Sequence, residues 1–103
     1  MRSGDIVIID FGLPVGSTPA LVKPAVVITA QPTLDEFVQT FHVVPITSTE
    51  RRWPSDVATD RGHAQCHLVT TVDQSQVMES TAENVGAVTL TQIREIVSVL
   101  LGL

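Results

Sequence analysis

Short apolar runs, separated by polar segments that contain glycine or proline, make up most of this chain. Three of them stand out: residues 5–11 (DIVIIDF), 25–29 (AVVIT) and 40–46 (TFHVVPI). Their β-branched side chains suit a pleated sheet, so we expect a strand at each place, the first of them buried on both faces. Pro24 opens the second strand. Pro45 cannot donate to a ladder, so we expect it at a strand end, a bulge or an edge.

The segments that follow these runs predict shorter elements. Residues 31–38 are polar and contain a proline, which favours a loop or a single helical turn. Short strands are expected at 55–59 and 76–80, a longer strand at 64–72, and a turn (Asp-Arg-Gly) at 60–62.

The end of the chain has the spacing of a helix. Thr89 and Gln92 match the capping box, in which two side chains satisfy each other's free backbone donors. Many short strands with one terminal helix predict a small, mostly β, barrel-like α+β domain. Gly102 ends the helix, whose apolar stripe consists of Leu90, Ile93, Val97, Leu100 and Leu101.

Composition narrows the class of protein. A chain of 103 residues and 11.1 kDa has the size of one domain, so we expect a single domain over residues 1–103. The net charge of −5 argues against non-specific coating of nucleic acid, but it leaves room for a local basic site. A mean hydropathy of +0.30 is high for so small a soluble protein and suggests a self-association surface.

The location of the protein is also constrained. No apolar run approaches the ~20 residues that span a bilayer, and the start of the chain has no signal-peptide cleavage pattern. The single cysteine, Cys66, excludes an internal disulfide framework and fits a reducing compartment. We therefore expect a cytoplasmic protein that does not contact the membrane.

Lys23 is the only lysine of the chain, and it stands between a glycine- and proline-rich loop and a predicted strand. Loops beside rigid strands often carry functional sites. An isolated lysine is nevertheless more often a solubilising surface residue, so the amino-acid composition of the chain alone favours that interpretation.

Residues 47–53 bring hydroxyl, guanidinium and indole groups together. Two arginines beside an indole suit a clamp for phosphate with a surface on which a base stacks. The alternative is a solvated turn with its tryptophan packed on the core, and spacing alone leaves the two interpretations even. The residues concerned are Thr47, Ser48, Arg51, Arg52 and Trp53.

Two further groups carry weaker signals. Asp73 and Gln74 follow the longer predicted strand. A carboxylate and an amide at such a place either orient a hydroxyl group or cap a turn, and capping a turn is the commoner case. His63, Cys66 and His67 resemble part of a zinc site, but one cysteine without a second cluster does not supply four ligands. We expect no metal site.

Four segments occur in the order and spacing of a known family. Together they resemble the MazF/PemK toxins of bacterial type II toxin–antitoxin systems, from Gly4 to nearly the end of the chain. The segments are 4–11 with Gly16-Ser17 and 23–27 (KPAVV), 43–48 (VVPITS), Trp53-Pro54 with Val57, and Asp73-Gln74.

The resemblance implies a compact SH3-like barrel of short antiparallel strands with a C-terminal α-helix, assembled as a homodimer. It also implies a metal-independent endoribonuclease, without a cofactor, that cleaves single-stranded RNA such as mRNA in a sequence-selective way. In such toxins the 2′-hydroxyl attacks the adjacent phosphorus and leaves a 2′,3′-cyclic phosphate and a 5′-hydroxyl. A cognate acidic antitoxin with a disordered segment occupies the site until it is degraded.

The resemblance further implies roles for particular residues. Lys23 stands where the family usually has arginine. The compact ammonium charge of lysine thus takes the place of a planar guanidinium group. Thr71 stands where PemK-type toxins carry an arginine. The implied catalytic residues are Lys23, Thr47 and Asp73, and the implied RNA-binding residues are Ser17, Ser48, Arg51, Arg52, Trp53 and Gln74.

Two other functions are compatible with the same small barrel. One is a non-enzymatic toxin in the manner of the CcdB gyrase poisons, whose C-terminal residues matter for binding and whose ending is faintly similar to Leu101-Gly102-Leu103. The other is an SH3-like interaction module. RNA cleavage separates the first interpretation from the second, and dependence on Lys23 separates an enzyme from a module.

Overall fold

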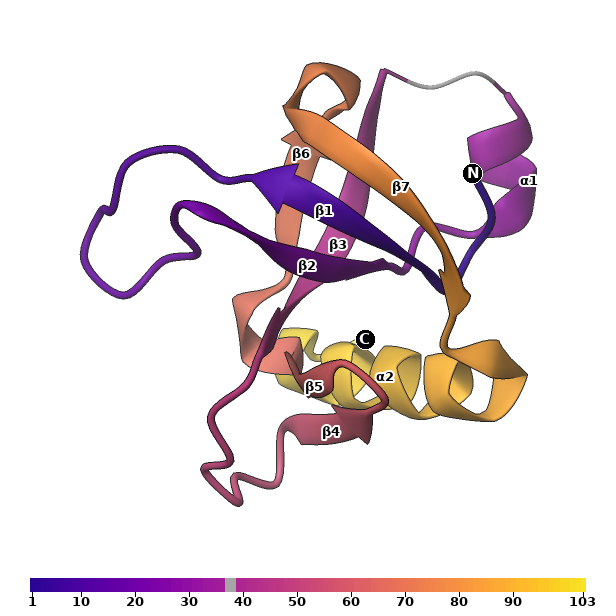
Figure 1. The fold of residues 1–103 in the computed structure, drawn as a ribbon. Helices are drawn as coiled ribbons and strands as arrows, with labels where there is room; N and C mark the ends of the chain where they lie inside the picture. Colours follow the sequence, from indigo (N-terminus) through magenta and orange to yellow (C-terminus); the bar gives the residue numbers. More distant parts are fainter. Residues whose placement is uncertain (37–38) are drawn as a thin grey trace.

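The computed structural model describes residues 1–36 and 39–103, and it consists of one curled antiparallel sheet with a long helix beneath it (Figure 1). The sheet order is β4-β5-β3-β2-β1-β7, and β6 pairs with β3 beside β5. The strands are β1 (Asp5–Asp10), β2 (Val22–Val27), β3 (Thr40–Thr47), β4 (Asp56–Thr59), β5 (Gly62–Gln65), β6 (Thr70–Asp73) and β7 (Val77–Asn84). The helices are α1 (Gln31–Asp35) and α2 (Gly86–Leu101), with 3₁₀ turns η1 (Cys66–Leu68) and η2 (Gln74–Gln76).

The predicted fold class is confirmed, with one refinement of the barrel. Among the described residues, β4, β6 and β7 each pair on one side only, so backbone hydrogen bonds leave the sheet open. The predicted strands at 5–11 and 40–46 are present, and the second strand begins at Val22, so that Pro24 lies inside it. The predicted single turn at 31–38 is α1, and residues 37 and 38 lie outside the described residues.

The strand β3 changes partner along its length, and this overturns the single strand expected at 64–72. Residues 40–43 of β3 pair with β6, whereas Ile46 and Thr47 pair with β5. Because β5 and β6 lie beside different ends of β3, the chain between them must break, and η1 is that break. Pro45 lies at the change of partner, where it pairs only with Ala25 of β2 among the described residues, so its missing N–H breaks no ladder.

The helix α2 begins at Gly86, three residues before the predicted capping box, so that prediction is wrong. The Asn84 side chain accepts a hydrogen bond from the Gly86 N–H at 2.8 Å and satisfies one free donor of the first turn. Gly102 ends the helix in the left-handed conformation with φ 72°, as expected.

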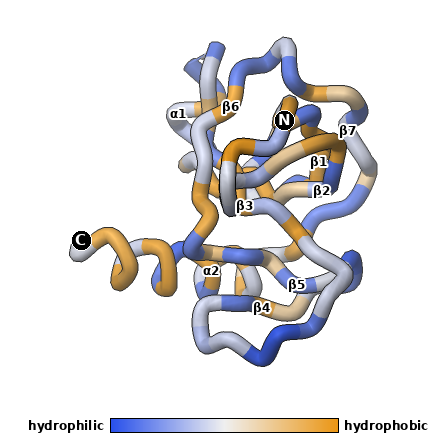
Figure 2. The backbone as a smooth tube through the Cα atoms, turned by 90° about the vertical axis from the view of Figure 1, so that its left-hand side faces the viewer, coloured by the Kyte–Doolittle hydropathy of each residue, from blue (hydrophilic) through white to orange (hydrophobic). Residues whose placement is uncertain are grey.

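Only the first part of the predicted stripe packs on the sheet. Leu90, Ile93 and Val97 are buried, whereas Leu100 and Leu101 are 49% and 58% exposed. Figure 2 shows this apolar end of α2 extending away from the body of the sheet.

The core lies on both faces of the sheet. One cluster joins the sheet to α2, and the other lines the opposite face. Neither helix of the described residues is long and apolar enough to span a membrane. The first cluster contains Ile6, Val26, Val44, Ile46, Val57, Ala64, Cys66, Ile93 and Val97. The second contains Val7, Ile9, Ala25, Val27, Phe41, Val43 and Val72.

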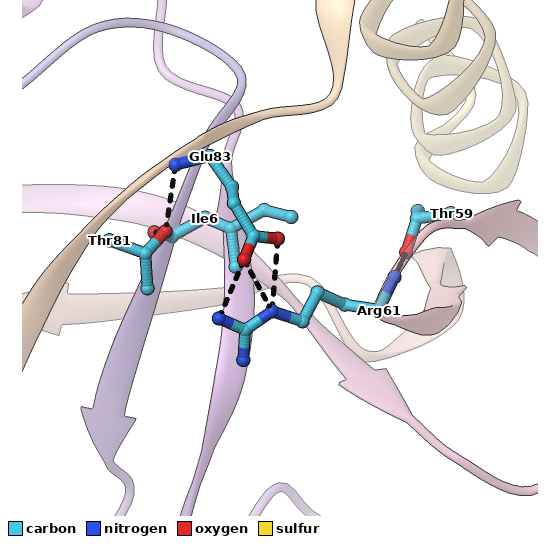
Figure 3. Close-up of polar contacts among 5 residues, drawn as sticks. All are labelled: Ile6, Thr59, Arg61, Thr81 and Glu83. Carbon is cyan, nitrogen blue, oxygen red and sulfur yellow. Dashed lines mark hydrogen bonds and ion pairs between the residues drawn. The ribbon is translucent and has the colours of Figure 1, made fainter.

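A side-chain ion pair joins two parts of the sheet that the backbone leaves apart. Arg61, in the turn between β4 and β5, binds the Glu83 carboxylate of β7 through Nε at 3.0 Å and Nη2 at 2.8 Å (Figure 3). The pair borders a cavity of about 660 Å³ whose lining includes Ile6 and Thr89. The β4–β5 hairpin is therefore held to β7 by charge rather than by a ladder.

Candidate nucleic-acid interface

Lys23 and Thr47 lie where two neighbouring strands separate. The pairing of β2 with β3 ends at Ala25 and Pro45, and Lys23 and Thr47 are two residues further along on the same strand faces. Lys23 is half-buried, and its side chain forms no hydrogen bond or ion pair with any described residue. The Thr47 hydroxyl oxygen accepts from the Thr49 N–H at 3.2 Å, which leaves its O–H free to donate, and Ser48 beside it is exposed.

The loop after β3 holds its two arginines in different ways. Arg51 binds both oxygens of Asp56, at 2.9 Å from Nη2 and 3.2 Å from Nε, and the Asp56 side chain is only 4% exposed. Arg52 is 88% exposed and approaches Glu50 only at 3.7 Å. Its φ of 55° is left-handed, which is unusual for a side chain of this size. Arg52 is therefore the more accessible cation.

Trp53 lies on the surface of this loop and is not buried in the core. Its ring is stacked against the Arg51 guanidinium at 3.8 Å, and the His67 ring lies 5.3 Å away at an angle of 51°. The structure therefore brings together Trp53, Arg51 and His67 from two segments of the chain.

Asp73 lies at the other end of β3 from Thr47. It pairs with Thr40, and the length of β3 separates Thr40 from Thr47 by roughly 20 Å along the strand. Its carboxylate accepts hydrogen bonds from the Ser75 N–H at 2.8 Å and from the Gln39 amide at 3.1 Å. The bonds from Ser75 and then from Gln39 lower the pKa of Asp73, because both favour the charged carboxylate.

The turn at Asp73 also reaches the base of the β1–β2 loop. Gln76 donates from its side-chain amide to the Asp10 carbonyl at 3.1 Å. The Gln76 side-chain oxygen accepts from the Asp73 N–H, and together with the bond from the Ser75 N–H to the Asp73 carboxylate this makes Asp73 the N-cap of η2. Ser17 is exposed in the β1–β2 loop that extends from the sheet in Figure 1. The predicted residues thus fall into two groups: Asp73 and Gln74 lie toward the base of the Ser17 loop, and Thr47 leads into the arginine–tryptophan loop.

The sequence did not reveal the partners that hold these side chains. Asp56 fixes Arg51, Gln39 fixes Asp73, and the His67 ring packs at a tilt against Trp53, although the sequence pointed to His67 only as a metal ligand. The described residues contain no group of three or more His, Cys, Asp or Glu side chains arranged to hold a metal ion. No periodicity joins residues 39 and 73 or 53 and 67, because these contacts depend on how β3 pairs and on the break at η1.

Solved structures that share this fold are small toxins and their complexes. MazF from Deinococcus radiodurans superposes with a TM-score of 0.87 at 18% identity, over 100% of this chain and 97% of that one. A MazE–MazF complex from the same organism gives 0.80 at 22% identity, covering 100% and 96%. An endoribonuclease from a mycobacterial species, in complex with its cognate antitoxin, gives 0.79 at 18% identity, covering 100% and 96%.

These likenesses show a MazF-like fold. The model of the PemK-like, MazF-like toxins of type II toxin–antitoxin systems matches residues 2–101, and the chain belongs to that family. No curated relative matches the sequence.

Proposed function

We propose that this toxin is a metal-independent endoribonuclease that cleaves single-stranded RNA, including mRNA. The observation that carries the proposal is the position of Lys23, the sole lysine. It is half-buried, without an ion-pair partner among the described residues, and two residues beyond the last β2–β3 pair, as is Thr47 on β3. A cation with nearby hydroxyl donors suits a phosphodiester whose oxygens gain charge in the transition state. Family membership and the endoribonuclease among the similar structures support the same reaction class.

The reaction breaks one bond and forms another without added reactants. The RNA 2′-oxygen loses its proton and bonds to the adjacent phosphorus, the bond from phosphorus to the 5′-oxygen breaks, and that oxygen takes up a proton. Lys23 stabilises the charge that develops on the phosphoryl oxygens, while Thr47 and Ser48 donate hydrogen bonds to them. Products are a 2′,3′-cyclic phosphate and a 5′-hydroxyl.

The second group of residues binds RNA away from this phosphate. Asp73 is roughly 20 Å along β3 from Thr47, so we assign Asp73, Gln74 and Ser17 to a more distant nucleotide of the same strand. Asp73, which the resemblance makes catalytic, then positions a 2′-hydroxyl or a base edge in its ionised form. RNA consequently runs across the face between the Ser17 loop and Trp53.

Two partners follow from the same proposal. An acidic antitoxin segment occupies the same face and competes with RNA, since a disordered acidic chain neutralises Lys23 and Arg52 as it folds on binding. A second copy of this chain packs on the exposed end of α2, where a groove of about 490 Å³ is lined by Pro54, Ile96 and Val99. Two copies place two such sites in one assembly.

The product ends test the proposal directly. Purified protein is incubated with single-stranded RNA in EDTA, and the new ends are identified by their reaction with polynucleotide kinase and with cyclic-phosphate-specific ligase. We expect 5′-hydroxyl and 2′,3′-cyclic phosphate ends, with the same rate with and without EDTA. Inhibition of gyrase supercoiling without RNA cleavage would support the CcdB-like alternative instead. The absence of both activities would support an interaction module.

A further inference from the structure

An aromatic ring held at the surface is a binding surface for a flat ligand. Trp53 keeps 47% of its area exposed, although indoles normally bury most of theirs. The Arg51 guanidinium lies 3.8 Å from its ring centre, and the exposed His67 ring lies at 5.3 Å. The exposed part of the indole is therefore fixed in place by two neighbours, which reduces the entropy that ligand binding has to overcome.

Arg51 is already engaged by a carboxylate. Three hydrogen bonds of 2.9 to 3.2 Å join its Nε and Nη2 atoms to both oxygens of Asp56. The Asp56 side chain is almost completely buried, and the two charges offset each other. A phosphate that bound Arg51 in place of Asp56 would leave that carboxylate buried and unpaired, which is costly.

Arg52 has the opposite properties. Its side chain is exposed, its contact with Glu50 at 3.7 Å is long, and it directly precedes the indole in the chain. An exposed pair of this kind contributes little, so Arg52 exchanges Glu50 for a phosphate at small cost.

We propose that Arg51, Trp53 and His67 form a stacking platform for one nucleobase of single-stranded RNA. Trp53 contacts the base, His67 extends the ring surface, Arg51 is a positioning residue that holds the indole, and Arg52 binds the flanking phosphate. The inference rests on the proposed function, because it takes RNA as the ligand. Stacking on a ring accepts every base, so the platform adds affinity and leaves sequence selection to other contacts.

Fluorescence tests the platform, since Trp53 is the only tryptophan and reports on its own contacts. The probe is a 2′-O-methyl oligonucleotide, which lacks the attacking hydroxyl and is not cleaved. We expect the oligonucleotide to quench Trp53 emission. One abasic replacement should remove the quenching and weaken binding to the wild type by roughly 5- to 150-fold. Trp53→Ala should bind the complete and the abasic oligonucleotides equally well, whereas Met78→Ala, an exposed control on β7, should behave as the wild type.

The salt dependence separates the two arginines. Arg52→Ala should lower the slope of log affinity against log salt by about 0.7, as expected for one lost phosphate contact on a single strand. The double variant Arg51→Gln with Asp56→Asn removes the pair without leaving a buried charge. It should reduce the quenching and the affinity but keep the wild-type slope. A slope lowered by the double variant would make Arg51 a phosphate ligand and overturn its positioning role.

The outcomes distinguish this inference from the function beneath it. Suppose that the wild type cleaves RNA, but every abasic replacement changes the affinity of the wild type and of Trp53→Ala by the same factor. The platform is then wrong and the proposed function stands. If the wild type neither binds nor cleaves single-stranded RNA, both are wrong. His67→Ala should weaken binding less than Trp53→Ala, and an equal loss without any change in quenching would contradict the role given to His67.

Discussion

Leu21 adopts a backbone conformation that leucine rarely takes. Its φ is 61°, and two hydrogen bonds hold it there: its N–H donates to the Gly12 carbonyl at 2.7 Å, and its carbonyl accepts from the Phe11 N–H at 2.8 Å. Left-handed geometry costs a side chain with a Cβ roughly 1–2 kcal/mol. These bonds close the base of the β1–β2 loop, so the strain fixes the direction in which the loop leaves the sheet.

Replacing this leucine by glycine should stabilise the protein. Leu21 is 59% exposed, so Leu21→Gly loses little burial while it removes the steric cost, and the free energy of unfolding should rise by about 1 kcal/mol. Urea denaturation measures the change. Leu13→Gly, in the same loop and without positive φ, is the matched control and should be neutral or slightly destabilising. Equal destabilisation by both variants would show that Leu21 carries no strain.

Single residues also show where sequence reasoning stops. Lys23, Thr47 and Ser48 flank strands whose apolar runs are plain in the sequence, and the register places Lys23 and Thr47 each two residues beyond the last β2–β3 pair, whereas their roles stay a prediction. The role of Asp73 was not determined by its position in the chain. A carboxylate that caps a turn and a carboxylate that binds a ligand at a strand end have the same sequence pattern. Only the contacts with Ser75 and Gln39 identify the cap.

At the scale of elements, the ion pair between Arg61 and Glu83 holds the β4–β5 hairpin to β7. The hydrogen bond to Arg61 lowers the pKa of Glu83, and the bond to Glu83 raises the pKa of Arg61. A carboxyl group with a lowered pKa stabilises the fold above its ordinary pKa of 4.5, and this contribution disappears as the pH falls through the lower value in the folded state.

Glu83→Gln should therefore lower the urea midpoint slightly at pH 7 and low salt, and should have no effect near pH 3 or at high salt. Both side chains are more than a third exposed, so screening keeps the effect small. Glu79→Gln on the same strand, whose carboxylate acts on Arg61 only through its charge and forms no hydrogen bond or ion pair with the other described residues, serves as the control and should change stability less. An undiminished effect of Glu83→Gln at high salt would contradict an electrostatic origin.

Elements with long apolar runs were predictable and breaks between them were not. The runs at β1 and β3 predict both strands because their apolar residues are nearly continuous, and most of these residues are buried, although Asp10, Thr40 and His42 are exposed. The stretch 64–72 also reads as one strand, but Ala64 and Gln65 belong to β5 and residues 70–72 to β6, and these two strands pair with different ends of β3. A tertiary constraint of that kind leaves no local pattern. The same holds for α2, whose first turn starts at Gly86, beside the Asn84 side chain, and not at the expected cap Thr89.

At the scale of the whole molecule, the exposed end of α2 predicts self-association. Val99 is 79% exposed beside the half-exposed Leu100, on a chain with mean hydropathy +0.30. A two-fold axis pairs such a patch with itself, which is the commonest arrangement of homodimers. The wild type should therefore sediment at twice 11.1 kDa at micromolar concentration.

A charge in this patch should separate the two copies. Val99→Glu should sediment as a monomer, because it places a carboxylate in the apolar contact. Val88→Glu makes the same change at the opposite end of the helix, where the side chain is 84% exposed, and should leave the dimer intact. A wild type that is monomeric at micromolar concentration, or a Val99→Glu protein that remains dimeric, would remove this surface from the account.

The central claim is that Lys23 makes this acidic chain an RNA-cleaving toxin, and the single-turnover cleavage rate of Lys23→Ala tests it most directly. Loss of one fixed electrostatic donor typically costs ~10²–10³ in rate, so the variant should be slower by about that factor with its fold and its sedimentation unchanged. Arg2→Ala, which removes one exposed positive charge elsewhere, should cleave at the wild-type rate, and Lys23→Arg should retain or raise activity. Cleavage by Lys23→Ala at the wild-type rate, in a preparation free of contaminating ribonuclease, would contradict the claim.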